Sequence, residues 1–90
     1  MPQPTISPSV DLGQQETAVL RVLVDSANRV VGRQEIARRA GLTGLNERRC
    51  DALLVTIRRV LGGDSIRTVR GRGWMLQPAA LDDARARLGT

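Results

Sequence analysis

The stretch SIRTVRGRGWML, residues 65–76, determines how the rest of the chain is interpreted. It contains two runs of residues typical of strands, Ile66–Arg70 and a second that begins at Gly73 or Trp74 and ends at Leu76. Between them lies GRG, and glycine on both sides of an arginine supplies the positive φ angles that a tight hairpin needs. The sequence therefore predicts a β-hairpin that carries Arg70 and Arg72 at its tip, away from the core.

Three helices are predicted ahead of this hairpin, from apolar residues at helical spacing and from residues that favour helix ends. The first runs from Gln14 to Ser26, the second from Arg33 to Ala40 and the third from Glu47 to Leu61. A short extended piece at Val30 and Val31 precedes the second helix. The apolar stripe of the first helix comprises Leu12, Val19, Leu20, Leu23, Val24 and Ala27.

The third helix has two different faces when its residues are placed at intervals of about 100°. One arc is apolar and is expected to face the core; it holds Cys50, Leu53, Leu54, Ile57 and Leu61. The opposite arc has arginines at its ends and small or apolar residues in its middle; it holds Arg48, Arg49, Ala52, Val55, Thr56, Arg59 and Val60. Three helices followed by a basic hairpin is the element order of a winged helix, whose third helix can enter a major groove.

Charge is unevenly distributed along the 90 residues. The chain has 14 cationic side chains, all of them arginine, against 9 acidic ones, for a net charge of +5. Residues 29–76 hold eleven arginines and four acidic residues, whereas residues 1–28 are net negative and the remainder is neutral. This concentration of positive charge predicts a polyanionic partner, although a solvated face is the ordinary alternative for any single arginine.

Composition also excludes several functions. The sequence has no histidine, no metal-ligand cluster and no nucleophile motif, so we expect neither an enzyme nor a cofactor. The single cysteine, Cys50, cannot form an internal disulfide, and we expect it to pack as a small hydrophobe. No apolar stretch approaches a signal sequence or a spanning helix in length. We therefore expect a cytoplasmic, nucleoid-associated protein with no membrane contact.

The domain boundaries follow from these elements. Residues 1–11 are rich in proline and small hydroxyl residues and predict a flexible N-terminal segment, with room for a short strand near Ile6 to Val10. Residues 12–77 form one domain. Residues 78–90 form a C-terminal tail that is either a frayed end or a short fourth helix with Leu81, Ala84 and Leu88 on one side.

Several motifs resemble the OmpR/PhoB-type transcriptional regulatory domain, the output domain of many bacterial response regulators. IRTVRGRGW is similar to that family's wing, I-x-T-V-R-G-x-G-Y, and RVVGRQEI is similar to its R-V-V-S-R-E-E-L. RRCDALLVTIRRVLG occupies the place of its recognition helix, commonly R-x-V-D-x-x-I-x-x-L-R-x-x-L-G, and Leu12 with Glu16 resembles its L-T-P-x-E helix start. The resemblance spans about Leu12 to Leu76.

The resemblance implies a winged helix-turn-helix of mainly α structure with a small β-hairpin (α+β), acting as a DNA-binding transcriptional regulator. The third helix would lie in the major groove and the wing on the minor groove or backbone. The DNA-binding residues expected on this basis are Arg48, Arg49, Ala52, Val55, Thr56, Arg58, Arg59, Thr68, Arg70 and Arg72. Expected partners are double-stranded DNA, RNA polymerase or another transcription protein, and a second copy of the chain on direct repeats.

Three departures from the family pattern bear on function. Leu53, Val55 and Thr56 stand where many members carry His or Arg, so base readout there would depend on thymine methyl contacts or be slight. Gly13 and Gly32 replace hydroxyl N-caps. The chain has almost no room for the family's N-terminal sheet and lacks a receiver domain, so it either works without phosphorylation or is a fragment; the initiating Met1 slightly favours a complete short protein.

The apolar middle of the third helix leaves a second function open. Ala52, Val55, Thr56 and Val60 could form a surface for another transcription protein, with the winged helix serving as a protein-interaction module. Protection of this helix by DNA or by a protein partner distinguishes the two functions.

Overall fold

The computed structural model describes residues 12–89 and shows four α-helices and one two-stranded sheet in that range. In chain order the elements are α1 (Gln14–Asp25), α2 (Arg33–Ala40), α3 (Glu47–Leu61), β1 (Ile66–Val69), β2 (Gly73–Leu76), the 3₁₀ turn η2 (Pro78–Ala80) and α4 (Leu81–Leu88). The predicted mainly α, winged helix-turn-helix fold is confirmed. The flexible segment and the strand predicted within residues 1–11 lie outside the described residues.

The helices end where the sequence offers caps. Gly32 and Asn46 are extended at the N-caps of α2 and α3, and the Asn46 side chain accepts a hydrogen bond from the Arg49 backbone N–H at 2.8 Å. Gly41 ends α2 in the left-handed region, at φ 72°. The first helix ends at Asp25, one residue earlier than predicted, because Ser26 is its C-cap.

The hairpin is antiparallel, with Ile66 paired to Leu76 and Val69 to Gly73. The first strand stops at Val69 and not at Arg70 as predicted, because the chain already turns at Arg70. The predicted extended piece joins this sheet through Val31, whose N–H donates to the Trp74 carbonyl at 2.7 Å and whose carbonyl accepts from the Trp74 N–H at 2.9 Å. The part of β2 near the turn is thereby attached to the α1–α2 connection.

One core lies between the helices and the hairpin. Its fully buried large side chains include Leu20 and Leu23 of α1, Ile36 of α2, and Leu54 and Ile57 of α3. Those of α1 and α3 come from the apolar faces predicted for these two helices. Val22 of α1 was not on the predicted stripe but is also buried, because α1 contacts α2, α3 and α4 and so needs a broader apolar face.

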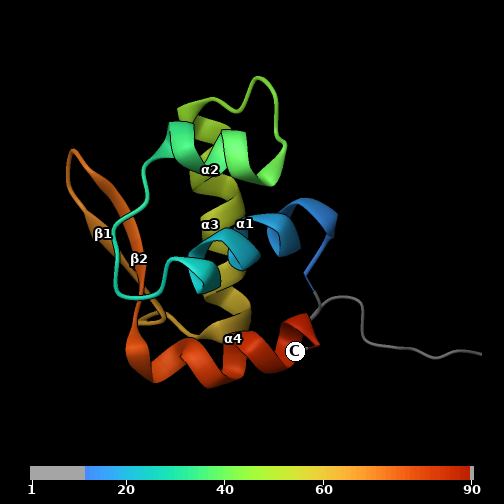
Figure 1. Ribbon diagram of the computed structural model, residues 1–90, viewed down its shortest axis with the longest axis vertical. Coiled ribbons are helices and arrows are strands. Elements are labelled where there is room, and N and C mark those ends of the chain that lie inside the picture. Colours follow the sequence, from blue (N-terminus) through green and yellow to red (C-terminus); the bar gives the residue numbers. More distant parts are fainter. Residues whose placement is uncertain (1–11, 90) are drawn as a thin grey trace, which may run out of the picture.

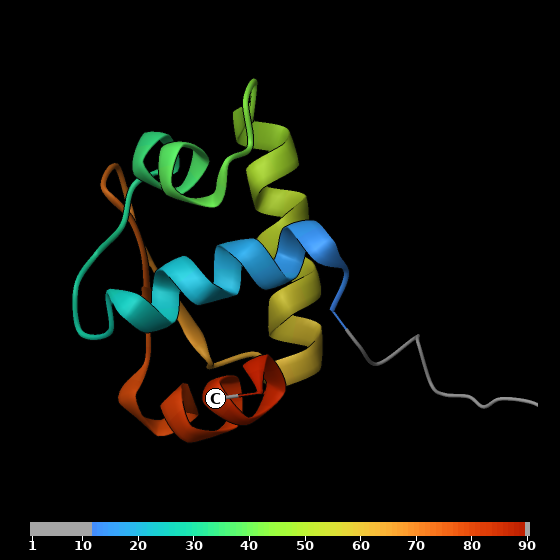
Figure 2. The same cartoon turned by 45° about the vertical axis from the view of Figure 1, so that its right-hand side comes forward.

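The C-terminal tail forms a helix that closes one end of this core. Figures 1 and 2 show α4 below α1 and α3, at the opposite end of the molecule from α2. Ala84 is fully buried in the cluster that includes the α1 side chains, while Leu81 and Leu88 are partly buried against it. Of the two states considered for residues 78–90, the structure therefore has the helix.

Candidate nucleic-acid interface

The outward side of α3 is a narrow stripe with arginines at its ends and apolar residues at its centre. Arg48, Ala52, Val55 and Arg59 are all exposed, and they are separated by four, three and four residues. Val55 is 49% exposed, and no other large hydrophobic side chain is classed as exposed in residues 12–89. The two guanidinium-bearing residues are eleven positions apart, which is about 16 Å along a helix axis. This stripe has the length and charge pattern of a helix that lies in a DNA groove.

Two other residues predicted for the site lie at the edge of the stripe away from the hairpin. The Arg49 guanidinium donates a hydrogen bond to the Gln15 side-chain oxygen of α1. The half-buried Thr56 hydroxyl donates to the Ala52 backbone carbonyl at 3.2 Å, within α3. Both polar groups therefore already have partners inside the protein.

Arg58 lies on the hairpin side of α3 and bonds to β1. Its Nε and Nη2 donate to the Ile66 carbonyl oxygen at 3.2 and 3.1 Å, and Nη2 also donates to the Thr68 hydroxyl at 2.6 Å. The structure thus brings together two residues that the sequence assigned separately to DNA. These bonds give Arg58 a function within the protein, because they join the third helix to the wing.

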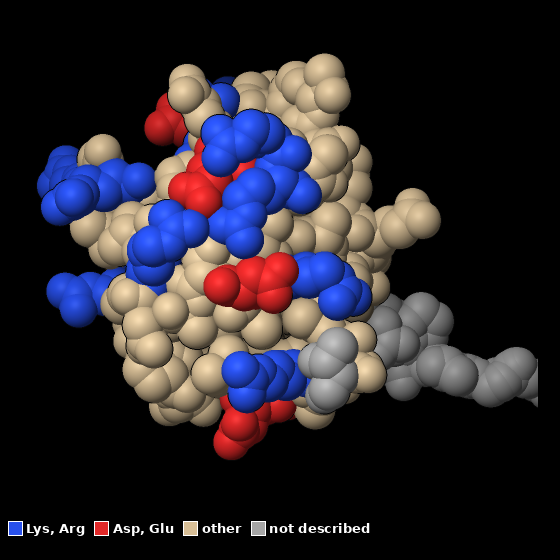
Figure 3. All heavy atoms as spheres, viewed as in Figure 1, with Lys and Arg blue, Asp and Glu red and all other residues tan. Residues whose placement is uncertain are grey.

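The hairpin tip carries the other predicted arginines. Arg70 and Arg72 are exposed in the turn, which is closed by a hydrogen bond from the Arg72 N–H to the Val69 carbonyl at 2.9 Å. In Figure 3 cationic side chains project beyond the body of the molecule on the side of the hairpin. Over the rest of that face cationic and acidic side chains lie next to one another. The hairpin thus presents positive charge outside the folded body.

A groove of about 660 Å³ separates the hairpin from α3. Its walls include Leu54, Val55 and Arg58 from the helix and Thr68 and Trp74 from the hairpin. The partly buried Trp74 is the aromatic residue of this lining. The indole packs against the core cluster and also lines the groove.

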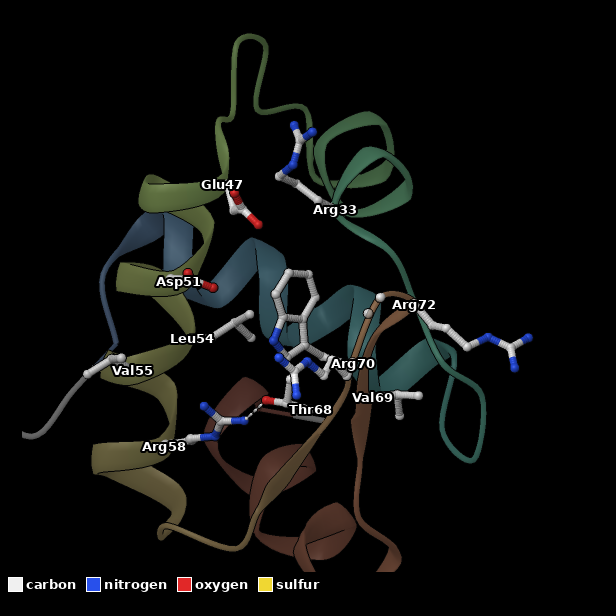
Figure 4. Close-up of a pocket in the computed structure, with 13 residues that line it drawn as sticks. Arg33, Glu47, Asp51, Leu54, Val55, Arg58, Thr68, Val69, Arg70 and Arg72 are labelled. Carbon is white, nitrogen blue, oxygen red and sulfur yellow. Dashed lines mark hydrogen bonds between the residues drawn. The ribbon is translucent and has the colours of Figure 1, made fainter.

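Sequence reasoning missed two acidic residues of this groove. Glu47 and Asp51 are exposed one helical turn apart on α3 and line the groove, and Figure 4 shows both on the side of α3 that faces the hairpin. The signal was present in the helical periodicity, since both residues fall between the apolar arc and the outward stripe.

The positive charge of the segment before α3 is partly neutralised within the protein. Glu35 of α2 accepts from Arg29 at 2.8 Å and from Arg39 at 2.9 Å, and both guanidiniums also donate to the buried Ser26 hydroxyl. The hydrogen bonds from Arg29 and Arg39 lower the pKa of Glu35 from 4.5 to about 2. This network joins α1 to α2 and offsets part of the charge of Arg29 and Arg39.

Residues 12–89 contain no group of three or more acidic, cysteine or histidine side chains that could hold a metal ion. Cys50 is fully buried in the core, and burial raises the pKa of its thiol to about 11, which keeps it protonated.

Comparison with known proteins agrees with this geometry. Residues 7–76 match the family described as transcriptional regulatory protein, C terminal, which is most of the chain. The chain therefore belongs to this OmpR/PhoB-type family, whose domains bind DNA and are regulatory rather than catalytic. No match was found among curated proteins or among solved structures. In the part of the chain that the structure describes, none of the helices has the length and apolar character of a membrane span.

Proposed function

We propose that the chain regulates transcription by binding double-stranded DNA with α3 in the major groove and the hairpin tip at the adjacent minor groove or backbone. The observation that carries this proposal is the placement of four exposed arginines on two neighbouring elements. Arg48 and Arg59 lie at the two ends of the α3 stripe, and Arg70 and Arg72 lie at the hairpin tip. Guanidinium groups form paired hydrogen bonds with guanine edges and phosphates, and they favour the negative potential of a narrow minor groove.

The residues between these arginines have complementary functions in the proposal. Ala52, Val55 and the Thr56 methyl group contact thymine methyls on the floor of the major groove, which is an apolar form of base recognition. Arg49 and Thr68 contact the sugar–phosphate backbone. Arg58 holds the wing beside the helix and adds positive charge near the same strand.

Replacement of Arg70 by alanine tests the wing. We expect specific binding to weaken by about 1–3 kcal/mol and the slope of log affinity against log salt to fall by about one. Arg67→Ala is the matched control, because Arg67 is an exposed arginine on the same hairpin that does not line the groove. Equal effects of the two substitutions would contradict a specific contact by Arg70.

A second copy of the chain and RNA polymerase, or another transcription protein, are the partners that this function implies. We propose head-to-tail binding of two copies on direct repeats. Sedimentation of the protein with duplexes carrying one or two copies of a selected site measures the number bound. One copy bound to a duplex with two sites would contradict the arrangement.

The exposure of Val55 favours one competing function, a protein-interaction module that uses the same stripe. An isolated apolar side chain at the centre of a helix face can anchor a partner protein as readily as a thymine methyl. Amide hydrogen exchange of α3 separates the two functions. Protection of residues 52–60 by duplex DNA supports the first, whereas protection by a transcription protein and none by DNA supports the second.

A further inference from the structure

Three hydrogen-bonding side chains on the exposed side of α3 already have partners within the protein. Arg58 bonds to the wing, Arg49 to α1 and Thr56 to its own helix. Ala52 and Val55 have no polar side-chain atoms. Within residues 12–89, Arg48 and Arg59 at the ends of the stripe, and Glu47 and Asp51 on the groove side, make no side-chain hydrogen bond or ion pair with another residue.

Asp51 is the member of this set whose presence is hardest to explain by stability. Glu47 is the first residue of α3, where a carboxylate interacts favourably with the positive end of the helix dipole. That effect is confined to the first turn, and Asp51 is the fifth residue. Aspartate is also a poor helix former in a helix interior. Neither helix formation nor an ion pair within the described residues accounts for this side chain.

Asp51 also stands next to the centre of the proposed DNA-binding stripe. It precedes Val55 by four residues, so the two side chains are neighbours on the helix surface, one turn or about 5.4 Å apart along the axis. Base pairs of DNA are stacked at intervals of about 3.4 Å. A helix that brings Val55 to one base pair therefore brings Asp51 to a base pair one or two steps away.

A carboxylate selects strongly among the groups in the major groove. It is an acceptor only, so it repels phosphate oxygens and the acceptor atoms of guanine and thymine. It can bond to an exocyclic amino group, and for Asp or Glu the usual partner is cytosine N4. A desolvated carboxylate without such a donor is strongly unfavourable, so it discriminates both by attraction and by repulsion.

We propose that Asp51 determines sequence specificity by accepting a hydrogen bond from the N4 amino group of one cytosine in the operator. The proposal rests on the DNA-binding function above and deepens it. It assigns polar base recognition to a residue at the groove edge of α3, in a helix whose central outward residues are apolar.

Selection of bound duplexes from a random DNA pool tests the proposal, with the wild type and three variants at the same salt concentration. Asp51→Ala should enrich the wild-type motif except at one cytosine position. At that position the preference for cytosine over the other bases should fall about five- to tenfold, as expected for the loss of one base contact. Asp51→Asn should change that position from cytosine to adenine, since an amide can pair with adenine N6 and N7. Glu47→Gln removes the same charge one turn earlier and should leave the motif unchanged.

The outcomes distinguish failure of the DNA-binding function from failure of the role proposed for Asp51. If the wild type enriches no motif, specific DNA binding itself is refuted and the role of Asp51 with it. If the wild type enriches a motif that Asp51→Ala preserves at every position, only the role of Asp51 is refuted. Circular dichroism checks that each variant is folded. Because Glu47 and Asp51 are both exposed, we expect their replacement to leave the fold intact.

Discussion

Replacement of Arg58 separates a function inside the protein from a contact with DNA. The guanidinium makes two hydrogen bonds to the Ile66 carbonyl and one to the Thr68 hydroxyl. Hydrogen bonds that involve a charged group contribute about 1.5–3 kcal/mol when buried. Because Arg58 is only half-buried, solvent competes for its donors, and we expect Arg58→Ala to lower the unfolding free energy by about 1–2 kcal/mol. For a domain of this size that corresponds to a decrease in Tm of about 5–10 °C.

Arg58→Lys separates the effect of the charge from that of the hydrogen bonds, because lysine keeps the charge but lacks the planar group that reaches two acceptors at once. We expect this variant to lose most of the same stability and to bind DNA with an unchanged salt slope. Thermal unfolding gives the first quantity, and titration of a selected duplex at several salt concentrations gives the second. A double-mutant cycle with Thr68→Val should give a coupling of about 0.5–1.5 kcal/mol in unfolding free energy.

The opposite pattern would refute this reasoning. If Arg58→Ala unfolds at the wild-type temperature while its salt slope falls by about one, the guanidinium is a phosphate contact and its bonds to β1 contribute nothing measurable.

Four further results are expected. In thermal unfolding, Gly73→Ala should lower stability several times more than Gly71→Ala, because a Cβ at Gly73 overlaps the Val31 carbonyl. At Gly71 only the positive φ is strained, which costs about 1 kcal/mol. Equal losses would contradict the close approach of Gly73 to Val31. Since the pKa of Glu35 is lowered, its contribution to stability should be complete above pH 4.5 and should disappear as the pH falls toward about 2. In chemical unfolding, the unfolding free energy of Glu35→Gln should therefore depend less on pH across that interval than that of the wild type. Ala84→Asp should lower Tm by 10 °C or more, because it places a charge in the core at a cost of about 3 kcal/mol. Ala86→Asp, on the exposed side of α4, is the control and should change Tm little. The Cys50 thiol should resist alkylation in the native protein at pH 8 and react fully after denaturation; rapid native labelling would show that α3 opens.

The sequence was most informative where local chemistry and packing agree. Apolar spacing located α2 and α3 at their observed bounds, and Asn46 and Gly41 marked helix ends through their own capping preferences. The GRG turn predicted the hairpin because only glycine adopts its φ angles readily. In each case, residues close together in the chain contained the information.

The remaining features depend on contacts between distant residues, which periodicity does not specify. Val22 is buried in a helix that contacts α2, α3 and α4, and its packing with α4 brings together segments about sixty residues apart in the chain. The bonds from Arg58 to β1 depend on how the hairpin folds back beside α3. An arginine on a basic helix edge has the same sequence pattern whether it bonds to a carbonyl or to a phosphate.

The two attachments of the hairpin have a mechanical consequence. Val31 holds β2 at Trp74, one residue pair from the turn, and Arg58 holds β1 at Ile66 and Thr68, so both strands are attached to the body of the protein before DNA arrives. A wing held in this way cannot follow variation in the width or direction of the minor groove. In the proposed complex the duplex would have to bend or narrow to meet it, at an energy that depends on the stiffness of the base-pair steps under the wing. We therefore expect operators to favour easily deformed steps, or an already narrow A·T-rich groove, at positions that no side chain contacts.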